Sequence, residues 1–258
     1  MDTPAPTPPP TVALFVTCLV NVMRPRIGFA AARALEAAGC QVVVPRAQTC
    51  CGQPALNSGD RDGAAAVARA GIATLEGYDH VVVPSGSCAG TISHAWPELL
   101  ADDAEWGPRA TALAGRTWEV MAYLDEVRGW RPQGVALSAT AAYHDSCSGL
   151  RELGIKRQPR RLLSQVDGLH LTPLANEETC CGFGGTFCVK YPAISNAIVG
   201  EKAAAIVDSG ADLLLAGDLG CLMNMAGKLH REGATTRAFH AIEVIAGMAD
   251  GPAIGENA

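Results

Sequence analysis

Cysteine is the residue type in this sequence that points most clearly to chemistry. The 258-residue chain has ten cysteines, and at two places two of them are adjacent. Cys50 and Cys51 open the segment C-C-G-Q-P, and Cys180 and Cys181 open C-C-G-F-G-G. Thiolate sulfur is a soft ligand that selects zinc, copper(I) or iron–sulfur clusters, and neighbouring thiols can also take part in redox exchange. The two pairs therefore predict metal or redox chemistry.

The paired cysteines belong to a longer repeat. Two sets of four can be matched, namely Cys18, Cys50, Cys51 and Cys88, and then Cys147, Cys180, Cys181 and Cys221. Matching members lie 129, 130 and 133 residues apart, and similar spacing within both sets indicates an internal duplication.

The segments around each set predict the same order of elements. In the first half, strand-like runs cover 12–18, 41–45 and 79–88, and helix-like segments cover 27–38 and 60–75. In the second half, strand-like runs cover 140–147, 169–173 and 211–221, and helix-like segments cover roughly 158–166 and 193–207. Continuous Val and Leu runs that alternate with helices are typical of parallel strands covered on both faces.

We therefore expect an α/β fold with two pseudo-repeated three-layer lobes, each a mainly parallel sheet flanked by helices. The segment 128–136 resembles a linker, so the first lobe is expected at 11–130 and the second at 131–258. The Pro-rich residues 1–10 are expected to form a disordered tail.

Each cysteine of the two sets is expected at or just beyond the carboxyl end of a strand, the edge at which open α/β sheets bind ligands. Four thiols should thus converge in each lobe. The C-x-x-C knuckle of structural zinc sites is absent, because Ser85 stands three residues before Cys88 and Asp218 three before Cys221. Adjacent cysteines and glycine-rich turns favour an iron–sulfur cluster, while zinc and a redox-active vicinal dithiol stay open as alternatives.

Composition excludes several other functions. A formal net charge of -6 without a basic run argues against nucleic acid as a partner. No secretory signal or bilayer-spanning run is present, so a cytoplasmic protein is expected, although a complex could dock it on a membrane. We find no hydrolytic constellation, and the glycines after Cys181 lack the register of a phosphate-binding loop.

Some remaining residues are ambiguous. Cys40 is expected in the core, and Cys188 is expected to be a spare thiol or a neighbour of the second site rather than a ligand. His144 and Asp145 precede Cys147, where they could contact a cluster or cap the next segment. A capping or helix-packing role is expected for four residues near the two lobe ends, namely Thr117, Glu119, His240 and Glu243.

Five motifs together resemble one known family. They are F-V-T-C-L-V at 15–20, C-C-G-Q-P-A-L-N-S-G at 50–59, P-S-G-S-C at 84–88, C-C-G-F-G-G-T-F at 180–187 and G-C-L-M-N at 220–224. From about Val12 to Ala246 the chain resembles the lactate utilization protein A family. It is also similar to the cysteine-rich CCG domains found in heterodisulfide reductase and in the iron–sulfur component of glycolate oxidase.

The resemblance implies an iron–sulfur electron-transfer subunit that helps oxidise L-lactate to pyruvate. It implies one cysteine-ligated cluster per lobe, expected to be of the four-iron, four-sulfur type, with the eight cysteines of the two sets as ligands. It further implies two partner proteins, one an iron–sulfur protein and one of the LUD-domain type. Open alternatives are a zinc-stabilised scaffold subunit and a thiol/disulfide redox protein like heterodisulfide reductase.

The chain departs from the heterodisulfide reductase relatives at two positions. Those relatives end each motif in C-x-x-C, and the first cysteine of that pair is replaced by Ser85 in one lobe and Asp218 in the other. Four cysteines remain per lobe, which suits an ordinary cubane cluster or a site with an added serine or carboxylate oxygen.

Overall fold

The computed structural model describes residues 8–256, and the first seven residues of the expected Pro-rich tail lie outside that range. Within it the chain forms two four-stranded sheets with the strand orders β2-β1-β3-β4 and β6-β5-β7-β8. All described strand pairs are parallel. The second sheet repeats the topology of the first, as the duplicated cysteine spacing predicts, and the α/β fold with two lobes is confirmed.

Most strands are short, and the inner strands of each sheet pair with a neighbouring strand on each side. The first sheet consists of β1 (Thr11–Leu14), β2 (Gln41–Val43), β3 (His80–Val83) and β4 (Thr117–Glu119). The second consists of β5 (Ala136–His144), β6 (Asp167–Thr172), β7 (Leu213–Ala216) and β8 (Arg237–His240). Val12 pairs with both Val42 and His80, and Ala141 pairs with both Leu171 and Leu213.

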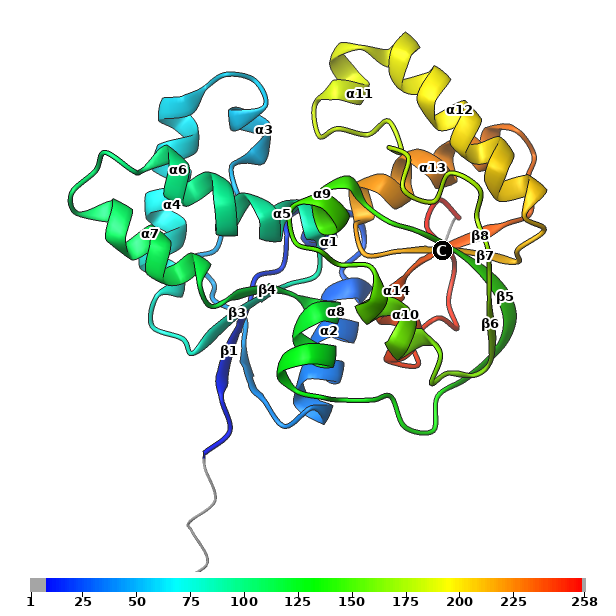
Figure 1. The fold of residues 1–258 in the computed structure, drawn as a ribbon, viewed down its shortest axis with the longest axis horizontal. Helices are drawn as coiled ribbons and strands as arrows, with labels where there is room; N and C mark the ends of the chain where they lie inside the picture. Colours follow the sequence, from blue (N-terminus) through cyan, green and yellow to red (C-terminus); the bar gives the residue numbers. More distant parts are fainter. Residues whose placement is uncertain (1–7, 257–258) are drawn as a thin grey trace, which may run out of the picture.

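Helices form three layers around the two sheets (Figure 1). Outside the first sheet lie α3 (Gln53–Leu56), α4 (Arg61–Leu75), α6 (Trp96–Leu99) and α7 (Trp106–Ala114). Outside the second lie α11 (Phe187–Lys190), α12 (Pro192–Asp208) and α13 (Leu219–Arg231). Between the sheets lie α2 (Arg26–Ala37), α8 (Val120–Ala122) with the π-helical turn η2 (Tyr123–Val127), α10 (Arg157–Leu163) and α14 (Ala241–Ile245).

The strands of the first sheet send alternate side chains to two different cores. Val12, Leu14 and Val82 pack into the large core that includes the central helices and the second sheet. Ala13 and Val81 pack into a smaller core against the outer helices of the first lobe. The central helix layer is therefore shared, because both lobes bury apolar faces in it.

Three short helices begin beside cysteines, and here the sequence-based strand limits were wrong. The helices are α1 (Cys18–Met23), α5 (Gly86–Gly90), which continues into the π-helical turn η1 (Thr91–Ala95), and α9 (Cys147–Arg151). The preceding strands end earlier than predicted because Thr17 accepts a hydrogen bond from the Val20 N–H and Ser85 accepts one from the Cys88 N–H. These bonds cap new helices and end the extended backbone.

The same correction applies to the other lobe. Strand β7 stops at Ala216, and the Asp218 side chain accepts the Gly220 N–H and begins α13, which contains Cys221. No helix of residues 8–256 combines the length and apolar character needed to cross a membrane.

Candidate metal centres

The first cysteine set comes together at the carboxyl edge of the first sheet. Cys18 begins α1, Cys50 and Cys51 lie in the loop after β2, and Cys88 lies in α5 after β3. The Sγ atoms of Cys18 and Cys50 are 3.7 Å apart, and those of Cys51 and Cys88 are 3.3 Å apart. Cys51 and Cys88 are buried whereas Cys18 is exposed, so this group of four thiols reaches the surface at Cys18.

The second set forms an equivalent group in the second lobe. Cys147 begins α9 after β5, Cys180 and Cys181 lie in the loop after β6, and Cys221 lies in α13 after β7. The ligand atoms of Cys181, Cys221 and His144 all lie within 4.8 Å of one another. The structure thus brings together all eight predicted site cysteines as two groups of four.

The glycine after each cysteine pair contributes a backbone donor. The Gly52 N–H lies 3.5 Å from Cys50 Sγ, and the Gly182 N–H lies 3.3 Å from Cys180 Sγ. Both glycines have positive φ, at 86° and 80°, in the region that favours glycine. The C-C-G motif therefore places an N–H group against the sulfur of its own first cysteine.

Hydrogen bonds among the thiols make one cysteine per lobe the preferred thiolate. Donation from Cys18 and then Cys51 lowers the pKa of Cys50 to about 2, while the bond to Cys50 raises the pKa of Cys18 well above its usual range. Donation from Cys147 and Cys181 likewise lowers the pKa of Cys180 to about 2. The first cysteine of each C-C-G is therefore the easiest to ionise, which metal binding requires.

Ser85 and Asp218, the two substituted positions, contact each other across the lobe interface. Ser85 Oγ donates to Asp218 Oδ2 at 3.0 Å, and the Ser87 N–H donates to the same oxygen at 3.1 Å. The other carboxylate oxygen accepts the Gly220 N–H at 3.2 Å. Both side chains are buried, and they serve as helix caps that tie the starts of α5 and α13 together.

The second group of thiols has polar neighbours. His144 is fully buried next to Cys181 and Cys221, and neither of its ring nitrogens makes a hydrogen bond of normal geometry among the described residues. Burial lowers the pKa of His144 to about 3, so its imidazole is neutral. Asp145 does not cap the next segment through its carboxylate but forms a bidentate ion pair with Arg160, at 2.8 and 2.9 Å.

Sequence reasoning missed Lys202, a fully buried residue of α12. Its ammonium donates to the carbonyl oxygen of Asn176, a residue with a left-handed backbone at φ 58°. A lysine on the buried face of an otherwise Ala-rich helix is the signal that could have identified it, because lysine is almost never fully buried without a partner.

The remaining ambiguous residues have structural contacts. Cys40 is buried in the large core, with its Sγ 3.8 Å from the Tyr123 hydroxyl, and Cys188 Sγ lies 3.6 Å from the Gly185 carbonyl oxygen. His240 and Glu243 form a capping box at the start of α14. Glu119 caps α8 by accepting the Met121 and Ala122 N–H groups, so the expected capping roles are confirmed for these three residues.

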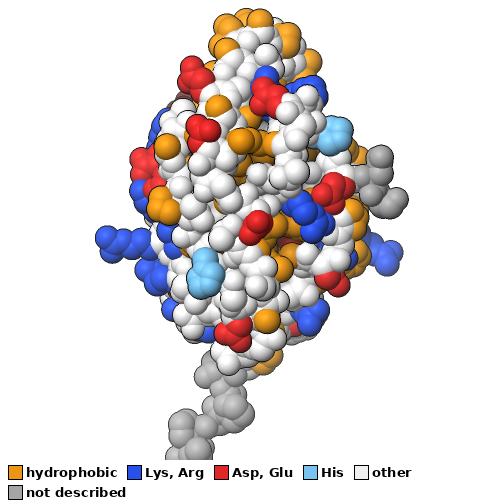
Figure 2. All heavy atoms as spheres, turned by 90° about the vertical axis from the view of Figure 1, so that its right-hand side faces the viewer, with side chains coloured by type: hydrophobic (Ala, Val, Ile, Leu, Met, Phe, Trp, Pro, Cys, Tyr) orange, Lys and Arg blue, Asp and Glu red, His pale blue; other side chains and the backbone are white. Residues whose placement is uncertain are grey.

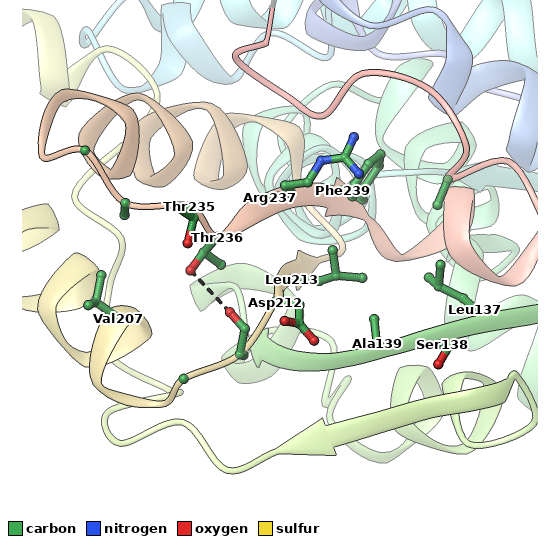
Figure 3. A pocket seen from close by; sticks show the side chains of 15 residues that line it. Leu137, Ser138, Ala139, Val207, Asp212, Leu213, Thr235, Thr236, Arg237 and Phe239 are labelled. Carbon is green, nitrogen blue, oxygen red and sulfur yellow. Dashed lines mark hydrogen bonds between the residues drawn. The ribbon is translucent and has the colours of Figure 1, made fainter.

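A cavity of about 180 Å³ lies against the first group of thiols. Its walls include Cys18, Cys50, Cys51 and Cys88 together with the second-lobe residues Phe183, Thr186 and Asp218. A larger cavity of about 710 Å³ lies at the opposite, amino edge of the second sheet (Figure 3). That cavity is lined by Asp212 and Arg237 among others and by no cysteine, so it is separate from the thiol groups.

The donor atoms fit a soft, thiolate-bound metal centre. Each group offers four sulfurs and backbone N–H donors to sulfur, and this combination suits zinc or an iron–sulfur cluster better than a hard cation. The buried Lys202 ammonium has no carboxylate within ion-pairing distance in the described part of the chain. An anionic metal–thiolate centre beside it would compensate its charge.

Comparison with known proteins agrees with this geometry. The model of the cysteine-rich CCG domain matches residues 12–93 and 141–226, which contain all eight cysteines. The chain is 45% identical to a lactate utilization protein A of Exiguobacterium sp., over 92% of this chain and 97% of that protein. It is 46% identical to one of Shouchella clausii, over 91% of this chain and 98% of that protein.

A solved structure has the same fold at much lower sequence identity. The crystal structure of a hypothetical protein from Helicobacter pylori has a TM-score of 0.67 and 15% identity, and it covers 98% of this chain. The chain spans about half the length of that protein. The motifs, the two thiol groups and the close relatives together establish that the chain belongs to the lactate utilization protein A family of cysteine-rich CCG-domain proteins.

Proposed function

We propose that this protein is the iron–sulfur electron-transfer subunit of a system that oxidises L-lactate to pyruvate. The observation that carries the proposal is the pair of matching four-thiol groups, one at the carboxyl edge of each sheet. The names of the relatives supply the link to lactate. An iron–sulfur cluster held at each group would supply one-electron transfer.

The residues of the chain have distinct roles in this function. The eight cysteines of the two sets hold the metal, and the Gly52 and Gly182 N–H groups stabilise charge on sulfur. Cys18 is the exposed ligand of the first group, so this edge is the shortest route from sulfur to the surface. Oxidation of lactate itself is assigned to the expected partners, an iron–sulfur protein and a LUD-domain protein.

The proposal is tested by anaerobic purification of wild-type protein and of Cys181→Ala and Cys188→Ala variants. Wild-type protein should contain iron and acid-labile sulfide and give a paramagnetic signal after reduction. Cys181→Ala should lose about half of both elements because it loses a ligand of the second group. Cys188→Ala is the matched control and should keep the wild-type content, since among residues 8–256 its thiol hydrogen-bonds to the Gly185 carbonyl oxygen and to no other cysteine.

Other outcomes identify the alternatives. Zinc at about one ion per lobe with no visible absorbance would favour a scaffold subunit. A vicinal disulfide that cycles with a thiol substrate would favour a thiol/disulfide protein. Equal loss of iron in both cysteine variants would contradict the assigned ligand set.

A further inference from the structure

The two thiol groups have different surroundings although the lobes repeat. The buried faces of α4 and α12 match when positions 131 residues apart are compared, since Ala64, Ala68, Gly71, Ile72 and Leu75 then correspond to Ser195, Val199, Lys202, Ala203 and Ile206. Lys202 therefore corresponds to Gly71. A Cβ atom added at Gly71 would lie 2.3 Å from the Trp96 ring, so an indole occupies this space in the first lobe.

A second pair of matching positions also has an aromatic residue in the first lobe and a polar residue in the second. His144 lies three residues before Cys147, and the residue three before Cys18 is Phe15. Phe15 is buried in the smaller apolar core, whereas His144 is buried beside Cys181 and Cys221. At these two positions the first lobe has aromatic rings, whereas the second lobe has an imidazole and an ammonium.

Two contacts place Lys202 beside the second group. Its ammonium donates to the carbonyl oxygen of Asn176, four residues before Cys180 in the same loop. Ser195, on the same buried face of α12, donates to the carbonyl oxygen of Gly182 in the second C-C-G motif. The one hydrogen bond of the Lys202 ammonium in the described structure goes to the neutral Asn176 carbonyl, so no carboxylate cancels its charge. Asp145 is neutralised by its bidentate pair with Arg160.

Asp218 is a second buried acid near the two groups of thiols, and its charge does not cancel the difference in charge between their surroundings. Asp218 hydrogen-bonds to Ser85 and to the Ser87 N–H of the first lobe, and it lines the cavity that contains the first four cysteines. Its negative charge therefore acts on the first group as well as on Cys221. Lys202 differs from Asp145 in being a buried charge of the second lobe without an ion-pair partner among residues 8–256.

On the basis of the proposed function, we infer that the second-lobe centre has the higher reduction potential and that Lys202 sets the difference between the lobes. Reduction adds negative charge, and a nearby ammonium in a poorly solvated site stabilises the reduced form more than the oxidised form. The position that corresponds to Lys202 in the first lobe is Gly71, and the Trp96 ring fills the space beside it, so no charge stands there. Lys202 acts through its charge and does not bind the metal.

The order of potentials is measured with two single-centre variants of the full chain, Cys51→Ala and Cys181→Ala. Each is loaded anaerobically and titrated against redox mediators, with the paramagnetic signal as readout. The centre left in Cys51→Ala, which belongs to the second lobe, should have the higher midpoint potential. Equal potentials or the reverse order would overturn the inference.

The role of Lys202 is measured by adding Lys202→Gln to both single-centre variants. Glutamine keeps a hydrogen-bond donor for the Asn176 carbonyl but removes the charge. The midpoint potential should fall in the Cys51→Ala background, stay unchanged in the Cys181→Ala background, and be restored towards the parent value by Lys202→Arg. Lys228→Gln, which removes a lysine paired with Glu232 on α13, should change neither potential.

The possible failures can be told apart. If Lys202→Gln folds and loads but leaves the second-lobe potential unchanged, Lys202 does not set it. If Lys202→Gln cannot be loaded, the comparison of Cys51→Ala with Cys181→Ala still decides the order. If neither single-centre variant holds a redox-active centre, the proposed function itself is wrong, and the inference falls with it.

Discussion

Glu119 has a fully buried carboxyl group at the junction of the two lobes. Its Oε2 accepts the Met121 and Ala122 N–H groups, and its Oε1 has no hydrogen-bond partner among the described residues. Burial raises the pKa of Glu119 to about 8, and the negative charge of Asp218 adds to the increase. The folded protein therefore holds Glu119 in its protonated form at neutral pH.

This raised pKa predicts that stability falls as the pH rises from about 4.5 to about 8. Below about pH 4.5 Glu119 is protonated in both the folded and unfolded states, and between there and about pH 8 the folded state binds more protons. The free energy of unfolding should fall across that window by on the order of 4 kcal/mol. Urea unfolding at pH 5 and pH 8 should show the fall in wild-type protein and a smaller one in Glu119→Gln. An identical pH dependence in the variant would contradict this account.

Helices α5 and α9 approach each other unusually closely at the lobe interface. A Cβ atom added at Gly86 of α5 would lie 2.9 Å from the Gly149 Cα of α9. Gly86 is the glycine of P-S-G-S-C, and Gly149 stands two residues after Cys147. These glycines let the two helices that contain Cys88 and Cys147 pack backbone to backbone.

The close approach predicts that Gly86→Ala is destabilising, because backbone atoms of α9 would have to move. We expect a loss of about 1–3 kcal/mol in the free energy of unfolding, measured by urea denaturation. Gly77→Ala is the matched control, since an added Cβ there meets nothing within 4 Å. Similar losses for both variants would show that the helix contact is not the cause.

At the scale of the whole molecule, the first lobe is tied to the C-terminal segment by arginines. Arg24 Nε lies 3.0 and 3.1 Å from the two carboxylate oxygens of Glu243, which is fully buried. Arg24 also donates to the Pro252 carbonyl oxygen and lies over the Phe239 ring. A neighbouring pair, Arg26 and Asp250, joins the same parts of the molecule but is largely exposed.

Because one ion pair is buried and the other is exposed, their removal should lower the free energy of unfolding by different amounts. Arg24→Ala leaves the Glu243 carboxylate buried without its partner and should lower the free energy of unfolding by about 3–5 kcal/mol. Asp250→Ala removes the exposed partner and should cost less than about 1 kcal/mol. Thermal and urea unfolding of both variants provide the measurement, and a larger loss in Asp250→Ala would refute the prediction.

An exposed apolar region marks the far end of the second lobe. Figure 2 shows apolar side chains gathered at the top of one face, the end where α11 meets α12 in Figure 1. The exposed apolar residues of this segment are Val189, Tyr191 and Ile194. The segment follows directly from the second C-C-G loop, so the thiol group and this surface belong to one stretch of chain.

The amino-acid sequence alone was enough to predict the duplication, the two parallel sheets and the membership of the two cysteine groups. It could do so because ligand spacing and Val/Leu runs are local features of the chain. It misplaced strand ends near Cys18 and Cys88, since the capping bonds of Thr17 and Ser85 that begin new helices were not recognised.

How the lobes meet and how their sites differ depends on the packing of the folded chain. The contact between Ser85 and Asp218 joins residues 133 positions apart, and the placement of Lys202 beside the second group depends on how α12 packs. The sequence already separates the lobes at one position, where Ser85 matches Asp218. Which charges become buried beside each group of thiols depends on the three-dimensional packing of each lobe, because burial is a property of the folded chain.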